Sequence, residues 1–322
     1  MWAYIVRRIL WTVPIVLGVM LITFTLFTLV AKDPARLYAG RHATPEVVAA
    51  IRHQMGLDKP VWINPGEAKT KGWTHFFNSQ FFDVLLFRFP PSIRYKEPVG
   101  ELFWRKAPIS LAIQLPVFII ELGLQLALAL LVASYRGRWP DYVTTLLAIL
   151  GMSVPALSIY LAAQWFFGAY WKIFPVAGWG IGFYAVQFAV LPIIVSVLGG
   201  IGGGTRFYRT VVLEEINSDY VRTARSKGVS AQNVLLTHVM RNVMIPVLTN
   251  TVTALPGLLM GALILERLFQ IPGVGGLLVE SVFNNDRSVV MGLTYALAIA
   301  YCLMLLLTDV CYTLVDPRVS FE

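Results

Sequence analysis

The sequence predicts an all-α membrane protein with six transmembrane helices, and three observations support this. Of the 322 residues, 57% are hydrophobic and 14% are charged, whereas about 25% are charged in an average soluble domain. The mean hydropathy is +0.67. Runs of residues without charge recur along the chain, and a helix needs about 20 apolar residues to cross a bilayer. This composition excludes an ordinary soluble enzyme and a disordered chain.

The uncharged runs locate the six helices. The first run is too long for the apolar core of a signal peptide, so it should persist as a helix. A glycine cluster at residues 199–204 is expected to end the fourth helix and let the chain turn. The helices are expected near residues 9–30, 108–134, 143–167, 184–201, 242–265 and 289–314.

The basic residues predict the orientation of these helices, because Lys and Arg favour cytoplasmic loops. With a cytoplasmic N-terminus, the cytoplasmic segments hold 11 basic residues and the short outer loops hold 3. An even number of helices returns the C-terminus to the same side. We therefore attribute the net charge of +8 to membrane topology and expect both termini in the cytoplasm.

Three parts follow from this arrangement. Residues 1–31 form the cytoplasmic N-terminus and the first transmembrane helix. Residues 32–107 form an extracytoplasmic segment, rich in proline and aromatic residues, which we expect to be a small cap packed on the helices. Residues 108–322 form the core domain with five transmembrane helices, and it contains a cytoplasmic loop at 202–241.

The cytoplasmic loop carries the most ordered local pattern. Asp219 is predicted to cap the start of a short helix, and Gly228 is predicted to end it in the left-handed conformation. Ser230 is predicted to cap a second, amphipathic helix after a sharp bend. The short helix is basic, and it fits either a segment on the anionic membrane surface or a docking helix for a cytoplasmic protein.

The side chains of the short helix bear on the docking interpretation. Tyr220, Ala224 and Lys227 are spaced to share one helix face. Thr223 and Ala224 are small, so they would let another protein approach the backbone closely.

Motifs along nearly the whole chain resemble one known family. Residues 219–228, D-Y-V-R-T-A-R-S-K-G, resemble the EAA-type coupling motif of ABC importer permeases, with Arg222 in place of the general motif's Glu. Further matching motifs occur in order at residues 4–8, 56–60, 174–178, 266–275 and 286–292. Together they resemble the B-type inner-membrane permease of the dipeptide/oligopeptide (peptide/nickel) ABC importer family. The chain departs from that family around residues 64–89, which are longer and more aromatic than the usual link.

The resemblance implies the ABC type I importer permease fold and a machine of several subunits. A homologous C-type permease would complete the translocation path, and an extracytoplasmic substrate-binding protein would deliver substrate. Two ATPase subunits, identical or different, would bind ATP and Mg, so this chain is expected to hold no cofactor, no metal and no catalytic residue. The location implied is a bacterial or archaeal cytoplasmic (inner) membrane, with lipid around the helices and no nucleic acid bound.

The resemblance also implies site residues. The expected ATPase-coupling residues are Asp219, Tyr220, Val221, Arg222, Thr223, Ala224, Arg225, Lys227 and Gly228. For the path itself, the side chains of the predicted helices suggest Asn250, Thr253, Met260 as part of an apolar gate, and Glu121. Polar side chains within membrane helices also serve as interhelical contacts, and for Glu121 a bond to a neighbouring helix or to the partner is preferred over recognition of substrate charge.

Several alternatives stay open at this point. The expected substrate is a di- or oligopeptide, and nickel–chelate complexes, glutathione, antimicrobial peptides or oligosaccharides are alternatives within the same machine. A secondary transporter would carry its own coupling site in repeated halves, and a channel or receptor subunit is a third class. The sequence has no Walker loop, no H-E-x-x-H and no G-x-S-x-G motif, so a membrane-embedded enzyme is poorly supported.

Overall fold

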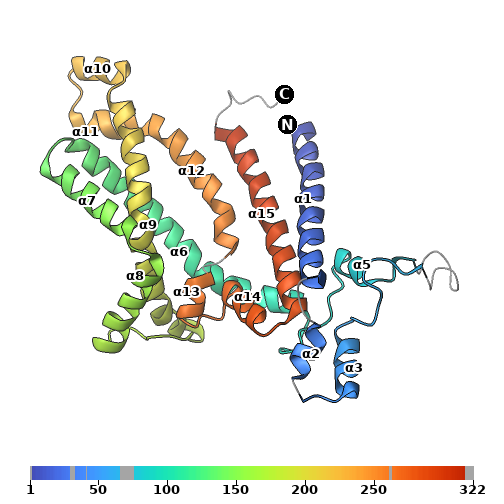
Figure 1. Cartoon of the computed structure of the whole chain (residues 1–322). Coiled ribbons are helices and arrows are strands. Elements are labelled where there is room, and N and C mark those ends of the chain that lie inside the picture. Colours follow the sequence, from blue (N-terminus) through green and yellow to red (C-terminus); the bar gives the residue numbers. More distant parts are fainter. Residues whose placement is uncertain (1, 30–32, 41, 66–75, 261–262, 316–322) are drawn as a thin grey trace. The chain divides into compact units, whose positions relative to one another are not determined.

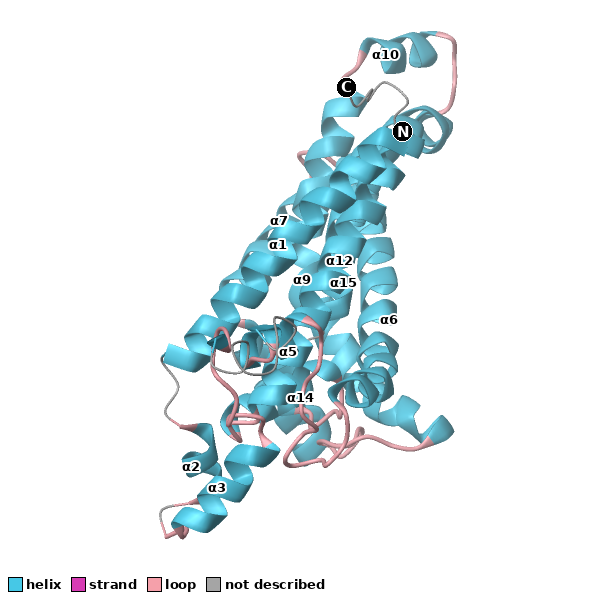
Figure 2. Ribbon diagram, turned by 90° about the vertical axis from the view of Figure 1, so that its right-hand side faces the viewer, coloured by secondary structure: helices cyan, strands magenta, loops and turns pink. Residues whose placement is uncertain are grey.

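The described part of the chain is helical. The structure is a computed structural model that describes residues 2–29, 33–40, 42–65, 76–260 and 263–315. Those residues form helices and connecting loops, and no β-strand occurs among them (Figure 2). The fold class predicted from composition is therefore confirmed as all-α.

The helices keep the order that the uncharged runs predict, with shorter helices between them. Most are α-helical, whereas η2 and η4 are π-helical and η3 is a 3₁₀ turn. In chain order they are α1 (Trp2–Leu29), α2 (Pro34–Ala39), α3 (Pro45–Gln54), α5 (Gln80–Leu85), α6 (Val99–Ser134), α7 (Trp139–Ser153), α8 (Ala156–Ala163), η2 (Gln164–Tyr170), η3 (Gly182–Tyr184), α9 (Ala185–Ile216), α10 (Asp219–Ser226), α11 (Ala231–Asn233), η4 (Val234–Val239), α12 (Met240–Met260), α13 (Leu263–Leu268), α14 (Val274–Phe283) and α15 (Arg287–Val315) (Figure 1).

Four helical stretches among the described residues are long and apolar enough to cross a membrane: Val6–Thr28, Val99–Ser134, Gly182–Ile216 and Arg287–Val310. A fifth span results if α7 and the α8–η2 helix are counted together, although they are bent by 94°. The helix predicted near 242–265 corresponds to α12 and α13, with residues 261–262 outside the described part, and it is not in this set. The structure thus supports several spans, four or five by length and composition.

Two sequence predictions about these helices are wrong. Helix α9 does not end at the glycine cluster of residues 199–204 but continues for 32 residues to Ile216. The predicted span at 143–167 is broken, because Val154 is extended, with ψ 125°, before Pro155. A proline disfavours the helical conformation of the residue that precedes it, which accounts for the break between α7 and α8.

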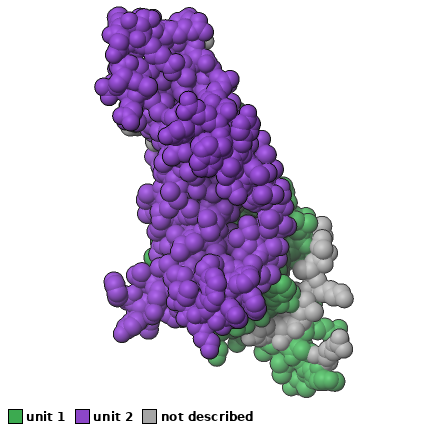
Figure 3. Space-filling model, turned by 90° about the vertical axis from the view of Figure 1, so that its left-hand side faces the viewer, with its two compact units in different colours: residues 1–109, 273–306 green, residues 110–272, 307–322 purple. Residues whose placement is uncertain are grey.

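The chain divides into two compact units, coloured separately in Figure 3: Met1–Ile109 with Gly273–Leu306 (unit 1), and Ser110–Pro272 with Leu307–Glu322 (unit 2). Unit 1 has one apolar cluster that joins α1 to α15 through Met20, Phe24, Met291 and Tyr295. The Tyr295 hydroxyl donates a hydrogen bond to the Met20 carbonyl oxygen at 3.1 Å. Burial of these side chains is what holds the two long helices of this unit together.

The segment between α1 and α6 packs on α14 and α15 within unit 1. The Ser92 hydroxyl donates to the buried Asp286 carboxylate at 2.6 Å, and the Tyr95 hydroxyl donates to Glu280 at 2.8 Å. Arg94 forms an ion pair with Glu280 at 2.7 Å. These polar contacts, together with the apolar cluster around Leu102, Leu277 and Leu293, fix the end of the segment before α6.

Unit 2 contains an apolar core near the end of α9 that leads to α10. It contains buried side chains from five helices: Ala129 and Ala133 of α6, Tyr208 and Val212 of α9, Val221 and Ala224 of α10, Val234 and Val239 of η4, and Val243 and Val247 of α12. Within this unit α10 lies beside α11 at one end of α9, and α8 lies toward the other end (Figure 1). The same core therefore supports both a surface helix and the interior of the helix bundle.

Candidate functional site

Local sequence signals define the ends of α10, with one correction. The helix begins at Asp219, so the capping position is Ser218, whose side chain makes no cap hydrogen bond. The prediction that Asp219 is the cap is wrong by one residue, and Asp219 instead places its carboxylate in the first turn, where the helix dipole favours negative charge. Gly228 has φ +77°, and its N–H donates to the Arg225 carbonyl at 3.0 Å. The predicted left-handed end is confirmed.

The bend after α10 leads directly into the next helix. The Val229 N–H donates to the Ala224 carbonyl at 3.3 Å, a bond that closes a helix end of this kind. The Ser230 hydroxyl accepts a hydrogen bond from the Asn233 N–H at 3.4 Å, as a helix cap does. Helical residues then continue through α11 and η4 into α12, so the bend connects α10 to the bundle without a flexible linker.

The buried face of α10 packs on this chain. Val221 is fully buried and Ala224 is 8% exposed, both in the core of unit 2. The small side chain of Ala224 therefore allows α10 to approach the core of its own chain, and the prediction that Ala224 is exposed to another protein is wrong. Tyr220 is partly buried against the same core, whereas Lys227 is exposed. The three residues predicted to share a face thus do not form one exposed surface.

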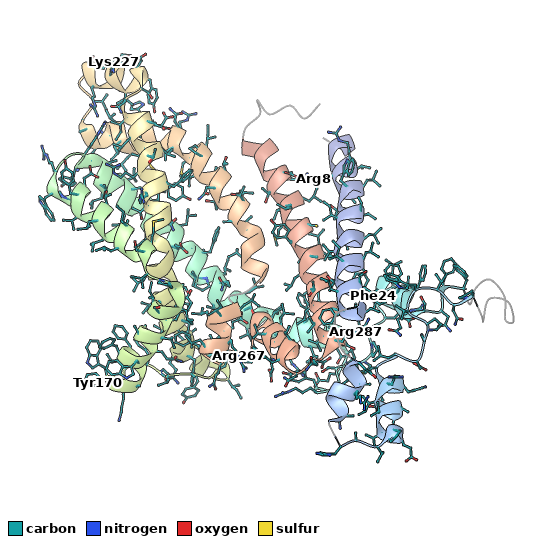
Figure 4. The ribbon with its side chains drawn as sticks, in the orientation of Figure 1. Arg8, Phe24, Tyr170, Lys227, Arg267 and Arg287 are labelled. Atoms are coloured by element: carbon teal, nitrogen blue, oxygen red, sulfur yellow. The ribbon has the colours of Figure 1, made fainter. Side chains whose placement is uncertain are left out.

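The opposite face of α10 is exposed and basic. The exposed residues are Asp219, Arg222, Thr223, Arg225, Ser226, Lys227 and Gly228. Arg222 forms an ion pair with Asp219 at 3.5 Å. Figure 4 labels Lys227 at the tip of this helix and Tyr170 at the other end of unit 2. We call the exposed residues of 219–228 the α10 surface.

Tyr220 ties α10 to its neighbours. Its hydroxyl donates to a Glu215 carboxylate oxygen at 2.6 Å, at the end of α9. Burial raises the pKa of the Tyr220 phenol, and the bond to Glu215 raises that pKa further, whereas a hydrogen bond with Asn242 at the start of α12 lowers it. The phenol thus bonds α10 to the end of α9 and lies beside Asn242 of α12.

A partly buried ion pair links α7 to α9 in the same unit. Arg209 donates from Nε and Nη2 to the two carboxylate oxygens of Asp141, at 2.8 and 2.9 Å. The Gly137 N–H donates to the same carboxylate at 3.0 Å. Because Asp141 is only 5% exposed and the guanidinium is held in two-point geometry, this pair fixes the position of α7 against α9 seven residues before α9 ends.

A second candidate site is a cavity of about 230 Å³ inside unit 2. Glu121 and Gln125 of α6 line it together with Tyr208 of α9 and Asn250 and Thr251 of α12. Two of the predicted path residues, Glu121 and Asn250, are therefore brought to one cavity by different helices. We call this space the α6–α9–α12 cavity.

Thr253, a third predicted path residue, is not among the residues that line this cavity. The Thr253 side chain is exposed, and its hydroxyl donates to carbonyl oxygens of its own helix, at Thr249 and Asn250. The side chain of Met260 lies outside the described residues. For Thr253 the outcome reflects the competition of backbone carbonyls for a helical hydroxyl.

Sequence reasoning missed Gln125 and Tyr208, which complete the polar lining. Gln125 donates from Nε2 to Glu121 Oε1 at 2.7 Å and to the Gly200 carbonyl oxygen at 3.2 Å. Asn250 donates from Nδ2 to the Tyr208 hydroxyl at 2.9 Å. The spacing of Glu121 and Gln125, one helical turn apart, was the signal available for Gln125.

Glycines of α9 make room for the polar side chains of α6. A Cβ atom at Gly200 would lie 2.0 Å from Glu121 Oε1, and one at Gly204 would lie 2.0 Å from Gln125 Oε1. A Cβ at Gly202 would lie 2.8 Å from the Ala148 carbonyl oxygen. The cluster predicted to break the helix therefore serves close packing, as small residues do between membrane helices.

Comparison with known proteins identifies the family. The family model described as "Binding-protein-dependent transport system inner membrane component" matches residues 125–321. A second model, described as "Binding-prot-dependent transport system membrane comp, N-term", matches residues 1–68.

Individual relatives match along their whole length. A protein of Brucella suis, provisionally named as a peptide transport system permease, is 33% identical over 328 residues, covering 100% of both chains. A protein of Escherichia coli (strain K12), provisionally named as a D,D-dipeptide transport system permease, is 31% identical over 344 residues, covering 99% of this chain and 98% of its own. A glutathione transport system permease of Salmonella choleraesuis is 31% identical over 325 residues, covering 99% of each. The chain therefore belongs to the family of binding-protein-dependent transport system inner membrane components and is a permease subunit of an ABC importer.

Proposed function

We propose that this permease carries di- or oligopeptides inward across a bacterial or archaeal cytoplasmic membrane, and that residues 219–228 couple it to cytoplasmic ATPases. Relatives named for peptide, D,D-dipeptide and glutathione transport support the substrate class, because all three names describe peptides or peptide-like molecules. The observation that carries the coupling proposal is the construction of α10, with its exposed basic face and its opposite face buried in the core of unit 2.

The core of unit 2 explains how a force on α10 would reach the helix bundle. Val221 and Ala224 share that core with residues of α6, α9, η4 and α12. Close-packed cores transmit displacement because they deform little. When the ATPases close on ATP, a shift of α10 would therefore carry the bundle with it, and transport would follow as a change between two populated states of the complex.

The basic residues of the α10 surface suit a protein partner. Arg222, Arg225 and Lys227 are exposed, and they can donate charge-assisted hydrogen bonds to carboxylates or carbonyl oxygens of an ATPase groove. Asp219, Tyr220, Val221, Thr223, Ala224 and Gly228 complete the proposed coupling segment by forming and positioning the helix. ATP and Mg would be bound by the ATPase subunits.

The proposed topology has six spans with both termini in the cytoplasm. In it α12 with α13 forms the fifth span, α7 with α8 and η2 forms one broken span, and residues 32–107 lie outside. The 11-to-3 distribution of basic residues supports this orientation. A homologous C-type permease, two ATPases and an extracytoplasmic substrate-binding protein complete the proposed machine, within membrane lipid.

Isolation of the complex tests this proposal. The chain is pulled down from gently solubilised native membranes, and accompanying proteins are identified by mass spectrometry. We expect a second permease, Walker-containing ATPases and a binding protein whose bound ligand is a peptide. Recovery of the chain alone would favour an ATP-independent secondary transporter, and recovery of the machine with a nickel chelate or sugar in the binding protein would overturn the substrate class only.

A matched pair of variants tests the coupling segment itself. Replacing Arg222, Arg225 and Lys227 with Gln should reduce ATPase recovery and ATP-driven uptake, because the charged contacts are lost while α10 keeps its buried face. The control replaces Arg136 and Arg138, two exposed basic residues of the α6–α7 connection, with Gln. Equal ATPase recovery from the two variants would refute docking through the α10 surface.

A further inference from the structure

The α6–α9–α12 cavity has the composition of a site for a cation. Among the described residues, Glu121 is the one charged residue that lines it, beside Gln125, Tyr208, Asn250 and Thr251. The other described lining residues are Phe118, Leu122, Gly200, Gly204 and Ala254. Glu121 lies within the apolar stretch Val99–Ser134, where a carboxylate is costly and marks a functional group with a partner. The partners of this carboxylate therefore decide what the cavity can bind.

The hydrogen bonds within the cavity leave an excess of acceptors. Gln125 uses both N–H groups of its amide, on Glu121 Oε1 and on the Gly200 carbonyl, and Asn250 donates to the Tyr208 hydroxyl. Among the described residues no donor reaches Glu121 Oε2, Gln125 Oε1 or Asn250 Oδ1. Three acceptor oxygens and one negative charge thus surround the space, and Tyr208 offers only one hydroxyl hydrogen.

A primary ammonium group matches this set. It carries one positive charge and three N–H donors with no acceptor, so it complements three acceptor oxygens, one of which belongs to a carboxylate. An anion would face the Glu121 charge, and an apolar group would leave the acceptors without donors, which costs free energy in a buried site.

The size of the cavity limits what part of a ligand enters. About 230 Å³ is smaller than the roughly 300–1,000 Å³ of pockets that enclose a whole drug-sized molecule. One end of a peptide would fit, and the rest would remain in the wider path. Gly200 and Gly204 set this volume, since a Cβ at either position would occupy the space of Glu121 or Gln125.

We infer that the α6–α9–α12 cavity binds a primary ammonium group of the substrate in transit, either the N-terminal ammonium of a peptide or that of a lysine side chain. The inference rests on the proposed peptide function and adds to it a recognition site inside the permease. Glu121 supplies the charge, Gln125 and Asn250 supply further acceptors, and Gln125 also holds the carboxylate against α9.

The test measures protection of a single cysteine placed in the cavity wall. The complete transporter is purified with Ala254→Cys in a background without the native cysteines, and the rate of maleimide labelling is followed. Three amides are added as probes: glycinamide, which has an α-ammonium; α-N-acetyl-lysinamide, which has only a side-chain ammonium; and N-acetylglycinamide, which has neither. We expect one or both ammonium probes, and not N-acetylglycinamide, to slow labelling. If only one of them does, that probe identifies the source of the ammonium group, and if both do, the cavity accepts either source.

Variants then assign the effect to Glu121. Glu121→Gln should raise the probe concentration for half protection about tenfold, as loss of one charge-assisted hydrogen bond predicts. Glu101→Gln, an exposed residue in the first turn of the same helix, is the control and should leave protection unchanged. The comparison of ammonium and acetylated probes stands even if Glu121→Gln assembles poorly.

The outcomes separate this inference from the proposed function. Absence of protection by both ammonium probes, or equal protection by N-acetylglycinamide, would overturn the ammonium site, whatever the complex transports. Protection in a complex that takes up no peptide would retain the site and overturn the proposed substrate class. ATP-dependent peptide uptake without protection would retain the proposed function alone.

Discussion

At the scale of single residues, Ala224 shows that a residue can match a coupling motif and still be buried within its own chain. Ala224 lies in the motif that resembles a coupling sequence, yet it is 8% exposed and belongs to the buried core of unit 2. Sequence spacing places Ala224 on one face of α10 but does not say which face meets the rest of the chain. That choice depends on the core that α10 shares with α6, α9, η4 and α12, whose residues lie outside the motif.

From the raised pKa of the Tyr95 phenol we predict that the stability of unit 1 depends on pH. Burial and the 2.8 Å hydrogen bond to Glu280 raise the pKa of Tyr95 from 10.0 to about 12. Below pH 10 the phenol is neutral in both folded and unfolded chains, and the bond to Glu280 contributes fully. Between pH 10 and about 12 only the unfolded chain loses the proton, so stability falls as pH rises.

Thermal unfolding of the detergent-solubilised protein checks this dependence. The wild-type midpoint should fall more steeply than that of Tyr95→Phe across the interval from pH 10 to about 12, because the variant has no phenol to titrate. Other tyrosines and lysines ionise in both proteins, so the difference between the two curves isolates Tyr95. Parallel curves would contradict the raised pKa.

At the scale of helices, local sequence signals predicted where a helix ends better than where a helix continues. The positive φ of Gly228 and the cap at Ser230 follow from residue type at helix ends, and both agree with the structure. The glycines at 199–204 carry the same local signal, but α9 continues through them. Their effect is decided by Glu121, Gln125 and Ala148 on neighbouring helices, which no window of local sequence contains.

Two adjacent glycines of α9 give a test of this packing role. Gly204→Ala should destabilise the protein by about 1–3 kcal/mol, because a Cβ there would lie 2.0 Å from Gln125 Oε1 and would displace a buried side chain. Gly203→Ala should change stability by less than about 0.5 kcal/mol, since nothing lies within 4 Å of a Cβ at that position. Unfolding in mixed detergent measures both, and equal effects would refute close packing at Gly204.

The end of α10 gives a second test at this scale. Proline cannot adopt the φ of +77° found at Gly228, so Gly228→Pro should redirect the chain after α10 while leaving membrane insertion intact. We expect roughly tenfold less co-purifying ATPase and a matching loss of uptake. Gly228→Asn is the control, because asparagine tolerates the left-handed region. Normal ATPase recovery with Gly228→Pro would show that the orientation of α10 does not matter for docking.

For the whole molecule, composition predicted the class of protein, and motifs predicted the family, but neither fixed the number of spans. Uncharged runs count α7, α8 and η2 as one helix, although the chain turns by 94° within it. Pro155 signals a break at that point but does not set the direction of the chain afterwards, which depends on packing of α8 against α9 and α13 within unit 2. The three spans proposed between α3 and α10, one of them broken, therefore need a direct measurement of sidedness.

Cysteine labelling from either side of the membrane supplies that measurement. Ser226→Cys on α10 and Gln54→Cys on α3 are both exposed positions, and each is placed in a chain with Cys302 and Cys311 replaced by serine. A membrane-impermeant maleimide should label residue 54 in intact cells stripped of any outer membrane, and residue 226 only in inside-out vesicles. This follows because the segments proposed to be cytoplasmic, α10 among them, hold 11 of the 14 basic residues that lie outside residues 32–107. The proposed topology has an odd number of spans between these two positions, so labelling of both from the same side would mean that the number is even. In that case either α10 would be out of reach of cytoplasmic ATPases, or residues 32–107 would be out of reach of an extracytoplasmic binding protein.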